Sequence, residues 1–323
     1  AFAPDTTITL AEALHQATEW LQKHEVVDPG PSASELLAKA AGFASPQDML
    51  RKWPAASSSA TTAGFTSAAE WDELRRLCRL RAGQHVPVQY LVGEWDFHSL
   101  SLEMQPPTLI PRPETEELVN MVLKWLRRDV IDMSGGAGGR CESLRFLDVG
   151  SGTGAIGLAL LKDLPGASCV AIDAQQTAVR LSRRNAERTG LQDRYACFHT
   201  GIAREGNFDG CFDFIVSNPP YIPRRDMEAL PRDVADHEDS VALDGGEDGL
   251  DVVREIVQRC PRLLRKGGPR QLWMEVDTSH PEVMQRWFGG EGGVGGDGWR
   301  GVQFEWMLDM SQRPRFVRLT FAD

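Results

Sequence analysis

The amino-acid sequence predicts an α/β protein, in which a seven-stranded, mostly parallel, doubly wound sheet follows a small N-terminal helical bundle and a connecting β-hairpin. Two observations lead to this fold class. From residue 143 onward, short apolar strand patterns alternate with helical patterns, which is typical of a parallel sheet covered by helices. Residues 1–85, in contrast, carry helical periodicity only.

The first 85 residues are expected to form a helical domain. The segment "TLAEALHQATEWLQKH" places Leu10, Leu14, Ala17 and Leu21 on one face of a helix. Helical patterns recur in "SASELLAKAAGF", "SPQDMLRKW" and "SAAEWDELRRLCRLRAG". The low-complexity segment "PAASSSATTAG" between the last two is predicted to be a mobile linker. This domain carries no catalytic motif.

Residues 86–110 are predicted to be a connecting β-hairpin. The segment "VQYLVGEWDFHSLSLEMQ" alternates around Gly93, as a pair of short strands does. A helix is then expected in "PRPETEELVNMVLKWLRRD", because proline suits a first helical position and acids in the first turn complement the helix dipole.

Residues 111–323 are predicted to form the sheet domain. Its seven strand patterns are "LRFLDV", "SCVAID", "YACFHT", "FDFIVS", "RQLWMEV", "VQFEWML" and "RPRFVRLTF". The last two are expected to pair antiparallel and to close the sheet. Helical patterns such as "AIGLALLKDL" and "GLDVVREIVQRCPRLLRKGG" separate the others, and "MSGGAGGR" and "GGEGGVGGDG" are predicted to be glycine-rich loops.

Composition and charge narrow the function classes. The chain has 323 residues, 41% of them hydrophobic, without an apolar run of the roughly 20 residues that would span a bilayer. A net charge of −11 disfavours a nucleic-acid substrate and suits a small molecule or a basic protein partner. The six cysteines and seven histidines lack metal-ligand spacing, so we expect reduced thiols and no metal site. The acids Glu238, Asp239 and Asp244 are expected to lie in a solvated loop. The start "AFAPDTTITL" resembles neither a signal peptide nor a transit peptide and lacks a Met, so a processed start is expected.

The segment "FLDVGSGTGAIG" has the pattern of a ligand-binding turn between a strand and a helix. Glycines at such a turn let a ligand approach the backbone, and the helix N-terminus offers free N–H groups. Asp173 ends the next strand, where an acid can accept both hydroxyls of a ribose. Dinucleotide enzymes typically carry G-x-G-x-x-G at this place. Here the acid Asp148 precedes the glycines, which suits a cationic cofactor such as S-adenosylmethionine better than a pyrophosphate. A tight turn without a ligand is the structural alternative.

The stretch "SNPPYIP" follows the apolar strand "FDFIV" and forms a second candidate site. Proline fixes its own φ and biases the preceding residue towards extended geometry, so this turn is stiff. A loop that only closes a strand is the structural alternative.

Three segments together carry a family resemblance: "LDVGSGTGAIGLAL", "IVSNPPYI" and "TLIPRPETEELV". They resemble the HemK/PrmC-type protein glutamine N5-methyltransferases, over nearly the whole chain. The resemblance implies a class I S-adenosylmethionine-dependent methyltransferase fold and methylation of the glutamine amide in the Gly-Gly-Gln motif of a class I peptide-chain release factor. "PVQYLVGEWDF" and "RPRF" are most similar to the animal mitochondrial branch, which implies the mitochondrial matrix; otherwise we expect a cytoplasmic protein.

The resemblance also assigns site residues. It implies that the methionine part of the cofactor is lined by Asp148, Gly150, Ser151, Gly152, Thr153 and Gly154. It places the ribose on Asp173, and Asn218 beside both cofactor and substrate. The substrate-amide site would comprise Asn218, Pro219, Pro220 and Tyr221. The border of the methyl-transfer pocket would comprise Arg112, Glu114 and Thr115. Where relatives often have an acid that contacts adenine, this chain has Gly201, so backbone groups or Ile202 are expected to hold that ring.

A carboxamide nitrogen is a poor nucleophile, which explains why such a site needs a stiff turn. The Asn218 Oδ1 and the Pro219 carbonyl can each accept one substrate N–H, and Tyr221 can stack on the planar amide. The alternatives are an N6-adenine nucleic-acid methyltransferase, which shares N-P-P-Y but needs a flipped base, and a cofactor-binding scaffold without catalysis. We expect a monomer that docks a release factor through the helical domain of residues 1–85 and binds neither nucleic acid nor membrane.

Overall fold

The computed structural model describes residues 9–52, 68–131, 144–204, 208–288 and 301–323. The segments predicted to be a mobile linker and glycine-rich loops (54–64, 133–140 and 289–298) lie outside these residues. The chain divides into two compact units. The first comprises residues 1–94 with 231–237, and the second residues 95–230 with 238–323.

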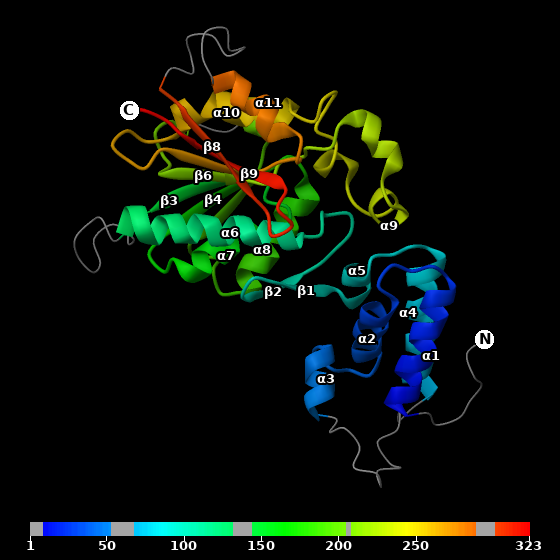
Figure 1. The fold of residues 1–323 in the computed structure, drawn as a ribbon. Helices are drawn as coiled ribbons and strands as arrows, with labels where there is room; N and C mark the ends of the chain where they lie inside the picture. Colours follow the sequence, from blue (N-terminus) through cyan, green and yellow to red (C-terminus); the bar gives the residue numbers. More distant parts are fainter. Residues whose placement is uncertain (1–8, 53–67, 132–143, 205–207, 289–300) are drawn as a thin grey trace. The chain divides into compact units, whose positions relative to one another are not determined.

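The first unit is helical, as the sequence predicts (Figure 1). Its elements are α1 (Leu10–Lys23), α2 (Pro29–Ala40), α3 (Pro46–Lys52), α4 (Ala68–Gly83), α5 (Val88–Val92) and α9 (Arg232–Ala235). The Thr9 hydroxyl accepts a hydrogen bond from the backbone N–H of Glu12 at 3.2 Å and caps α1. Helix α1 buries Leu10, Ala17 and Leu21, whereas Leu14 is partly exposed.

The predicted hairpin is shorter than expected. Residues Val88–Val92 form the helix α5, which starts behind Pro87 and ends at Gly93, whose φ of +85° makes it a left-handed C-cap. The strands β1 (Glu94–Phe97) and β2 (Leu100–Glu103) follow and form a two-stranded sheet. Placing Gly93 in the middle of a strand pair was therefore wrong, because the glycine terminates a helical turn.

The second unit contains the predicted seven-stranded doubly wound sheet. Its strands are β3 (Arg145–Val149), β4 (Ser168–Asp173), β5 (Tyr195–His199), β6 (Phe214–Ser217), β7 (Gln271–Glu275), β8 (Gln303–Leu308) and β9 (Pro314–Thr320). They are ordered β5-β4-β3-β6-β7-β9-β8. Strands β3 to β7 pair in parallel with their neighbours among them, and the predicted antiparallel pairing of the last two strands, β8 and β9, is confirmed. Strand β9 also runs antiparallel to β7. The strand order reverses between β3 and β6, which is where ligands of such sheets bind.

Helices cover both faces of this sheet (Figure 1). One face carries α6 (Pro113–Trp125), α7 (Ala155–Asp163) and α8 (Gln176–Arg188), and the other carries α10 (Asp251–Leu263) and α11 (His280–Phe288). Short helical turns complete the unit: Leu126–Ile131, Ile202–Arg204, Arg224–Ala229 and Ser240–Ala242. Within the described residues, none of the helices has both the length and the apolar character to cross a membrane.

Alternation along β3 decides which residues face which layer. Leu147 and Val149 belong to the buried cluster that includes Val253 of α10. Phe146 stacks instead on Phe214 at a centroid distance of 4.9 Å, on the face covered by α6. Because successive side chains of a strand point to opposite faces, Asp148 lies on the same side as Phe146.

Candidate active site

A cavity lies in the second unit at the carboxyl ends of β3, β4 and β6. The sequence-predicted residues that line it are Gly150, Gly152, Asp173, Ile202, Asn218, Pro219 and Pro220. The structure therefore brings together the glycine-rich turn after β3 and the "SNPPYIP" turn after β6, which are distant in the sequence.

The glycine-rich turn has a backbone that only glycine adopts readily. Gly150, Gly152 and Gly154 have φ values of +75°, +54° and +85°. The backbone N–H groups of Gly150 and Ser151 both donate to the Ile172 carbonyl, at 2.9 and 3.1 Å. These bonds fix the turn against β4, so its backbone presents a defined surface to the cavity.

Asp173 is an acidic residue of the cavity wall that backbone hydrogen bonds hold in place. Its Oδ2 accepts the backbone N–H of Gly152 and its Oδ1 that of Gln175, both at 2.8 Å. Burial raises the pKa of this carboxyl, and the two N–H bonds oppose the shift. Each carboxylate oxygen retains a second lone pair. Asp173 is thus fixed at the cavity with the capacity to accept two more hydrogen bonds.

Four residues of the same motif lie outside the cavity lining: Asp148, Ser151, Thr153 and Gly154. Asp148 is fully buried, and its Oδ2 accepts the backbone N–H of Gly157 in the first turn of α7 at 3.1 Å. Burial raises the pKa of Asp148 to about 7; the hydrogen bond from the Gly157 N–H opposes this shift, and the carboxylate of Asp173 adds to it. The alternation along β3 turns this side chain towards α7. Asp148 therefore supports the glycine-rich turn from the side of α7 and is not part of the cavity lining.

The turn after β6 is tied to its neighbours on both sides. The Ser217 hydroxyl donates to the Val149 carbonyl at 2.7 Å, which joins the ends of β6 and β3. The Ile222 backbone donates to the Leu243 carbonyl at 3.0 Å and accepts from the Gly245 N–H at 2.9 Å. Residues 243–249 therefore brace the segment that carries Asn218 and Tyr221.

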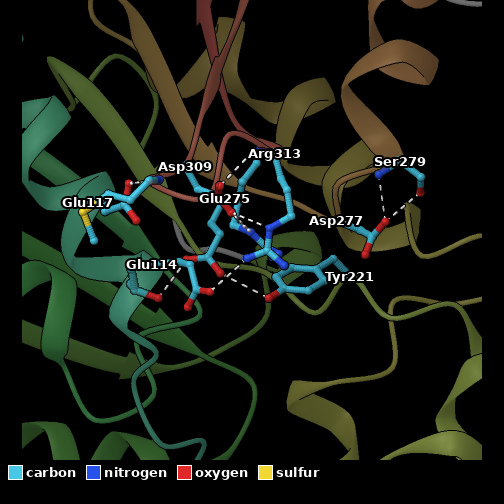
Figure 2. A network of polar contacts seen from close by, with 11 residues as sticks. Glu114, Glu117, Tyr221, Glu275, Asp277, Ser279, Asp309 and Arg313 are labelled. Carbon is cyan, nitrogen blue, oxygen red and sulfur yellow. Dashed lines mark hydrogen bonds and ion pairs between the residues drawn. The ribbon is translucent and has the colours of Figure 1, made fainter.

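A buried chain of polar groups connects this turn to α6 and β7. The Asn218 Nδ2 donates to Thr115 Oγ1 at 3.1 Å, and the Thr115 hydroxyl donates to Glu275 Oε2 at 2.7 Å. The Tyr221 hydroxyl donates to the other carboxylate oxygen of Glu275 at 3.1 Å (Figure 2). Burial and the carboxylate of Glu275 together raise the pKa of Tyr221, which keeps its phenol protonated. Tyr221 itself does not line the cavity.

The other two predicted border residues form ion pairs. The Arg112 guanidinium donates to both carboxylate oxygens of Glu238 at 2.8 Å, and Glu114 pairs with Arg313 at 3.4 Å (Figure 2). Neither Arg112 nor Glu114 lines the cavity, whereas Thr108 and Leu109 from the same segment do. The prediction of a solvated loop was wrong for Glu238, which is only 6% exposed and forms the ion pair with Arg112. Asp239 of the same segment lines the cavity.

Two further residues support the site, and the sequence interpretation missed both. Glu275 ends the strand "RQLWMEV" and is 1% exposed. An acid in a wholly buried strand was the available signal, since such a charge needs partners. Gly249 belongs to the segment "DGGEDG", whose composition is that of an ordinary loop, so the sequence carried no signal for its role. A Cβ added to Gly249 would lie 2.4 Å from the Tyr221 carbonyl oxygen, so only glycine fits there.

Comparison with known proteins agrees with this geometry. The family model "Methyltransferase small domain" matches residues 140–232. The human protein named MTRF1L release factor glutamine methyltransferase is 44% identical over 208 residues, which are 63% of this chain and 60% of the human protein. The release factor glutamine methyltransferase of Gloeobacter violaceus is 38% identical, over 67% of this chain and 71% of that protein. That of Deinococcus radiodurans is 34% identical, over 96% of this chain and 97% of that protein. This chain therefore belongs to the release factor glutamine methyltransferase family.

Proposed function

We propose that this protein transfers a methyl group from S-adenosylmethionine to the side-chain amide of the glutamine in the Gly-Gly-Gln motif of a class I peptide-chain release factor. The observation that carries the proposal is the orientation of Asn218 at the cavity. Its Nδ2 is bound to Thr115, and no described residue donates to its Oδ1. That oxygen is free to accept an N–H of a substrate amide, and membership of the family supports the same substrate.

The residues at the cavity fit S-adenosylmethionine. The backbone of Gly150 and Gly152 allows close approach of a ligand, and the carboxylate of Asp173 would accept both ribose hydroxyls. Ile172 and Ile202 line the cavity and would offer apolar surface to the adenine. Asp148, Ser151, Thr153 and Gly154 would shape the turn from behind. The cofactor would supply an electrophilic methyl group on a sulfonium.

Asn218 and Pro219 would orient the weak nucleophile. The Asn218 Oδ1 would accept one N–H of the substrate amide. The Pro219 carbonyl, which the ring of Pro220 fixes, would accept the other N–H. Both bonds strengthen as positive charge develops on the amide nitrogen, so they favour the transition state over the ground state. Tyr221 lies outside the cavity lining, so stacking of its ring on the amide stays a prediction. Its hydroxyl, bound to Glu275, would hold the turn that carries Asn218. The proton can leave after transfer, so no general base is required.

The direct test is mass spectrometry of class I release factors after incubation with this protein and labelled S-adenosylmethionine. We expect one methyl group on the glutamine of the Gly-Gly-Gln motif. A release factor with that glutamine replaced by alanine should stay unlabelled. Equal labelling of the two release factors would refute the glutamine assignment, and Asn218-dependent labelling of adenine in nucleic acid would favour the alternative reaction.

Replacing Asp173 with alanine is expected to weaken S-adenosylmethionine binding about tenfold to a hundredfold, because two charge-assisted hydrogen bonds to the ribose are lost. Isothermal titration calorimetry measures this change. Asp173→Asn serves as the graded control, since an amide oxygen can still accept a hydrogen bond from one ribose hydroxyl. The affinity of this variant for S-adenosylmethionine should lie between those of the wild type and Asp173→Ala. Unchanged affinity in a folded Asp173→Ala protein would remove this residue from the cofactor site.

The helical unit is proposed to dock the release factor, within a domain division of 1–85, 86–110 and 111–323. Among its described residues, the large apolar side chains of Val27 and Leu50 lie at the surface and are 71% and 63% exposed. We propose a monomeric enzyme that acts on this protein partner. The resemblance to the animal mitochondrial branch supports the mitochondrial matrix as its location, which fractionation of cells that express a tagged chain would test.

The double substitution Val27→Lys and Leu50→Lys is expected to raise KM for the intact release factor at least about tenfold. The reason is that the apolar contact of these two side chains with the release factor would be lost. Activity on a short peptide that contains Gly-Gly-Gln should change much less, because such a peptide lacks the rest of the release-factor surface that the helical unit is proposed to contact. Steady-state kinetics on the two substrates provide the comparison. An unchanged KM for the intact protein would show that docking does not use these side chains.

A further inference from the structure

Glu275 is a buried acidic residue that has no role in the proposed reaction so far. It lies at the end of β7 with 1% of its surface exposed, and it receives hydroxyl donors from two other elements. Thr115 belongs to the first turn of α6, and Tyr221 follows β6. Figure 2 shows the Tyr221 hydroxyl directed at Glu275. A buried carboxylate with two bonds from separate elements fixes those elements relative to each other.

The chemistry of these groups determines the direction of each hydrogen bond. Burial raises the pKa of Glu275, and the hydrogen bonds from Thr115 and Tyr221 and the charge of Arg315 oppose this shift. In its ionised form the carboxylate only accepts, so both Thr115 and Tyr221 donate to Glu275. The Thr115 hydroxyl has one hydrogen, and it is used in the 2.7 Å bond. Towards Asn218, at 3.1 Å, this hydroxyl can therefore only accept. Asn218 must present its Nδ2 to Thr115 and turn its Oδ1 the other way.

The direction matters because the two ends of a carboxamide are nearly equal in size. If the side chain of Asn218 rotated by 180°, its NH₂ group would face the substrate NH₂, and two donors would oppose each other. Without an acceptor behind Thr115, its hydroxyl could donate to Asn218 Oδ1 and stabilise that rotated form. The carboxylate thus excludes an orientation in which the proposed substrate cannot bind productively.

We propose that Glu275 is a positioning residue that acts through Thr115 to set which end of Asn218 faces the cavity. It does not touch the substrate, and through Tyr221 it also anchors the ring of the same turn. The inference rests on the proposed glutamine methylation for its catalytic consequence. The orientation of Asn218 itself is independent of which substrate the enzyme uses.

Kinetics test the relay with matched variants at Thr115. Thr115→Val keeps the shape and removes the hydroxyl, and we expect kcat on the release factor to fall about 10- to 100-fold, the scale of one unsatisfied buried polar group. Thr115→Ser keeps the hydroxyl and should stay within about threefold of the wild type. KM and the affinity for S-adenosylmethionine should change little in both. Equal loss in the two variants would show that shape, and not hydrogen-bond direction, is what matters.

Variants at Glu275 test whether the effect originates there. Glu275→Leu removes both acceptors and should lower kcat about as much as Thr115→Val, whereas Glu275→Gln retains one acceptor and should lie in between. Adding Thr115→Val to Glu275→Leu should cost little more, because both interrupt the same chain. Fully additive losses in the double variant would overturn the relay. If Glu275→Leu does not fold, the pairing of Glu275→Gln with Thr115→Val gives the same comparison.

A measurement without activity separates this inference from the proposed function. In protein labelled with ¹⁵N at asparagine, the Asn218 side-chain NH₂ resonance, assigned through its absence in Asn218→Asp, should show slow hydrogen exchange in the wild type and in Thr115→Ser. Fast exchange is expected in Thr115→Val and Glu275→Leu. This pattern would support the relay even if the enzyme left release factors unmethylated. Slow exchange in all variants would overturn it.

Discussion

Replacement of Asn218 by alanine is expected to lower kcat for methyl transfer by about 10²–10³-fold, the typical loss when one preorganised partner of the transition state is removed. The fold should persist, because Asn218 contributes one side-chain hydrogen bond, to Thr115. Much of the affinity for S-adenosylmethionine should also remain. Single-turnover kinetics with labelled cofactor, together with a melting curve, separate the loss of chemistry from a loss of folding.

Asn218→Asp provides the control for charge and direction. An aspartate can still accept a substrate N–H, but it cannot donate to the Thr115 hydroxyl, whose hydrogen is used by Glu275. Cofactor binding is expected to stay equal or to tighten, because a negative charge would lie near a sulfonium, while kcat still falls. Methyl transfer at the wild-type rate by both variants would mean that Asn218 does not orient the substrate.

Gly249→Ala is expected to destabilise the protein by roughly 2–5 kcal/mol and to abolish most activity. Its φ of +79° is left-handed, and a Cβ would lie 2.4 Å from the Tyr221 carbonyl oxygen and 2.9 Å from the His280 ring. The strain of the backbone and the overpacking add to each other. The turn after β6 can accommodate the methyl group only by moving Tyr221. Chemical denaturation and kcat on the release factor measure the two effects.

Gly267→Ala is the matched control for this substitution. Gly267 has a similar φ of +71°, but a Cβ there meets no atom within 4 Å. We expect a loss of about 1–2 kcal/mol from backbone strain alone and unchanged kcat. If Gly249→Ala behaved like Gly267→Ala in both measurements, the brace formed by residues 243–249 would not hold the substrate turn.

The sequence was sufficient for the fold because local patterns specify it. The strands of the sheet are short apolar runs bounded by helices whose apolar faces repeat at helical spacing, and both signals are readable without tertiary information. The hairpin shows the limit of such patterns. Alternation around Gly93 is compatible with a strand pair, but the positive φ of a helix C-cap produces the same glycine.

The residues of the candidate site were predictable where they belong to a sequence motif. Gly150, Gly152, Asp173 and the residues of the turn after β6 follow directly after strands, and the carboxyl ends of β3, β4 and β6 meet at one edge of the sheet. Asp148 belongs to the same motif, yet it faces α7. The motif alone does not say which side of the strand a residue takes when that strand is buried on both faces.

What the sequence by itself determined is the fold class, the family and the two turns that form the cavity, because each is encoded by residues close together in the chain. Only the tertiary structure decided the support of those turns: Glu275 behind Thr115 and Asn218, Arg112 on Glu238, and the contact of Gly249 with Tyr221. The two residues of each of these contacts lie 28 to 160 positions apart in the sequence. Burial gives them their strength, since a polar group removed from water must find its partners wherever the fold brings them.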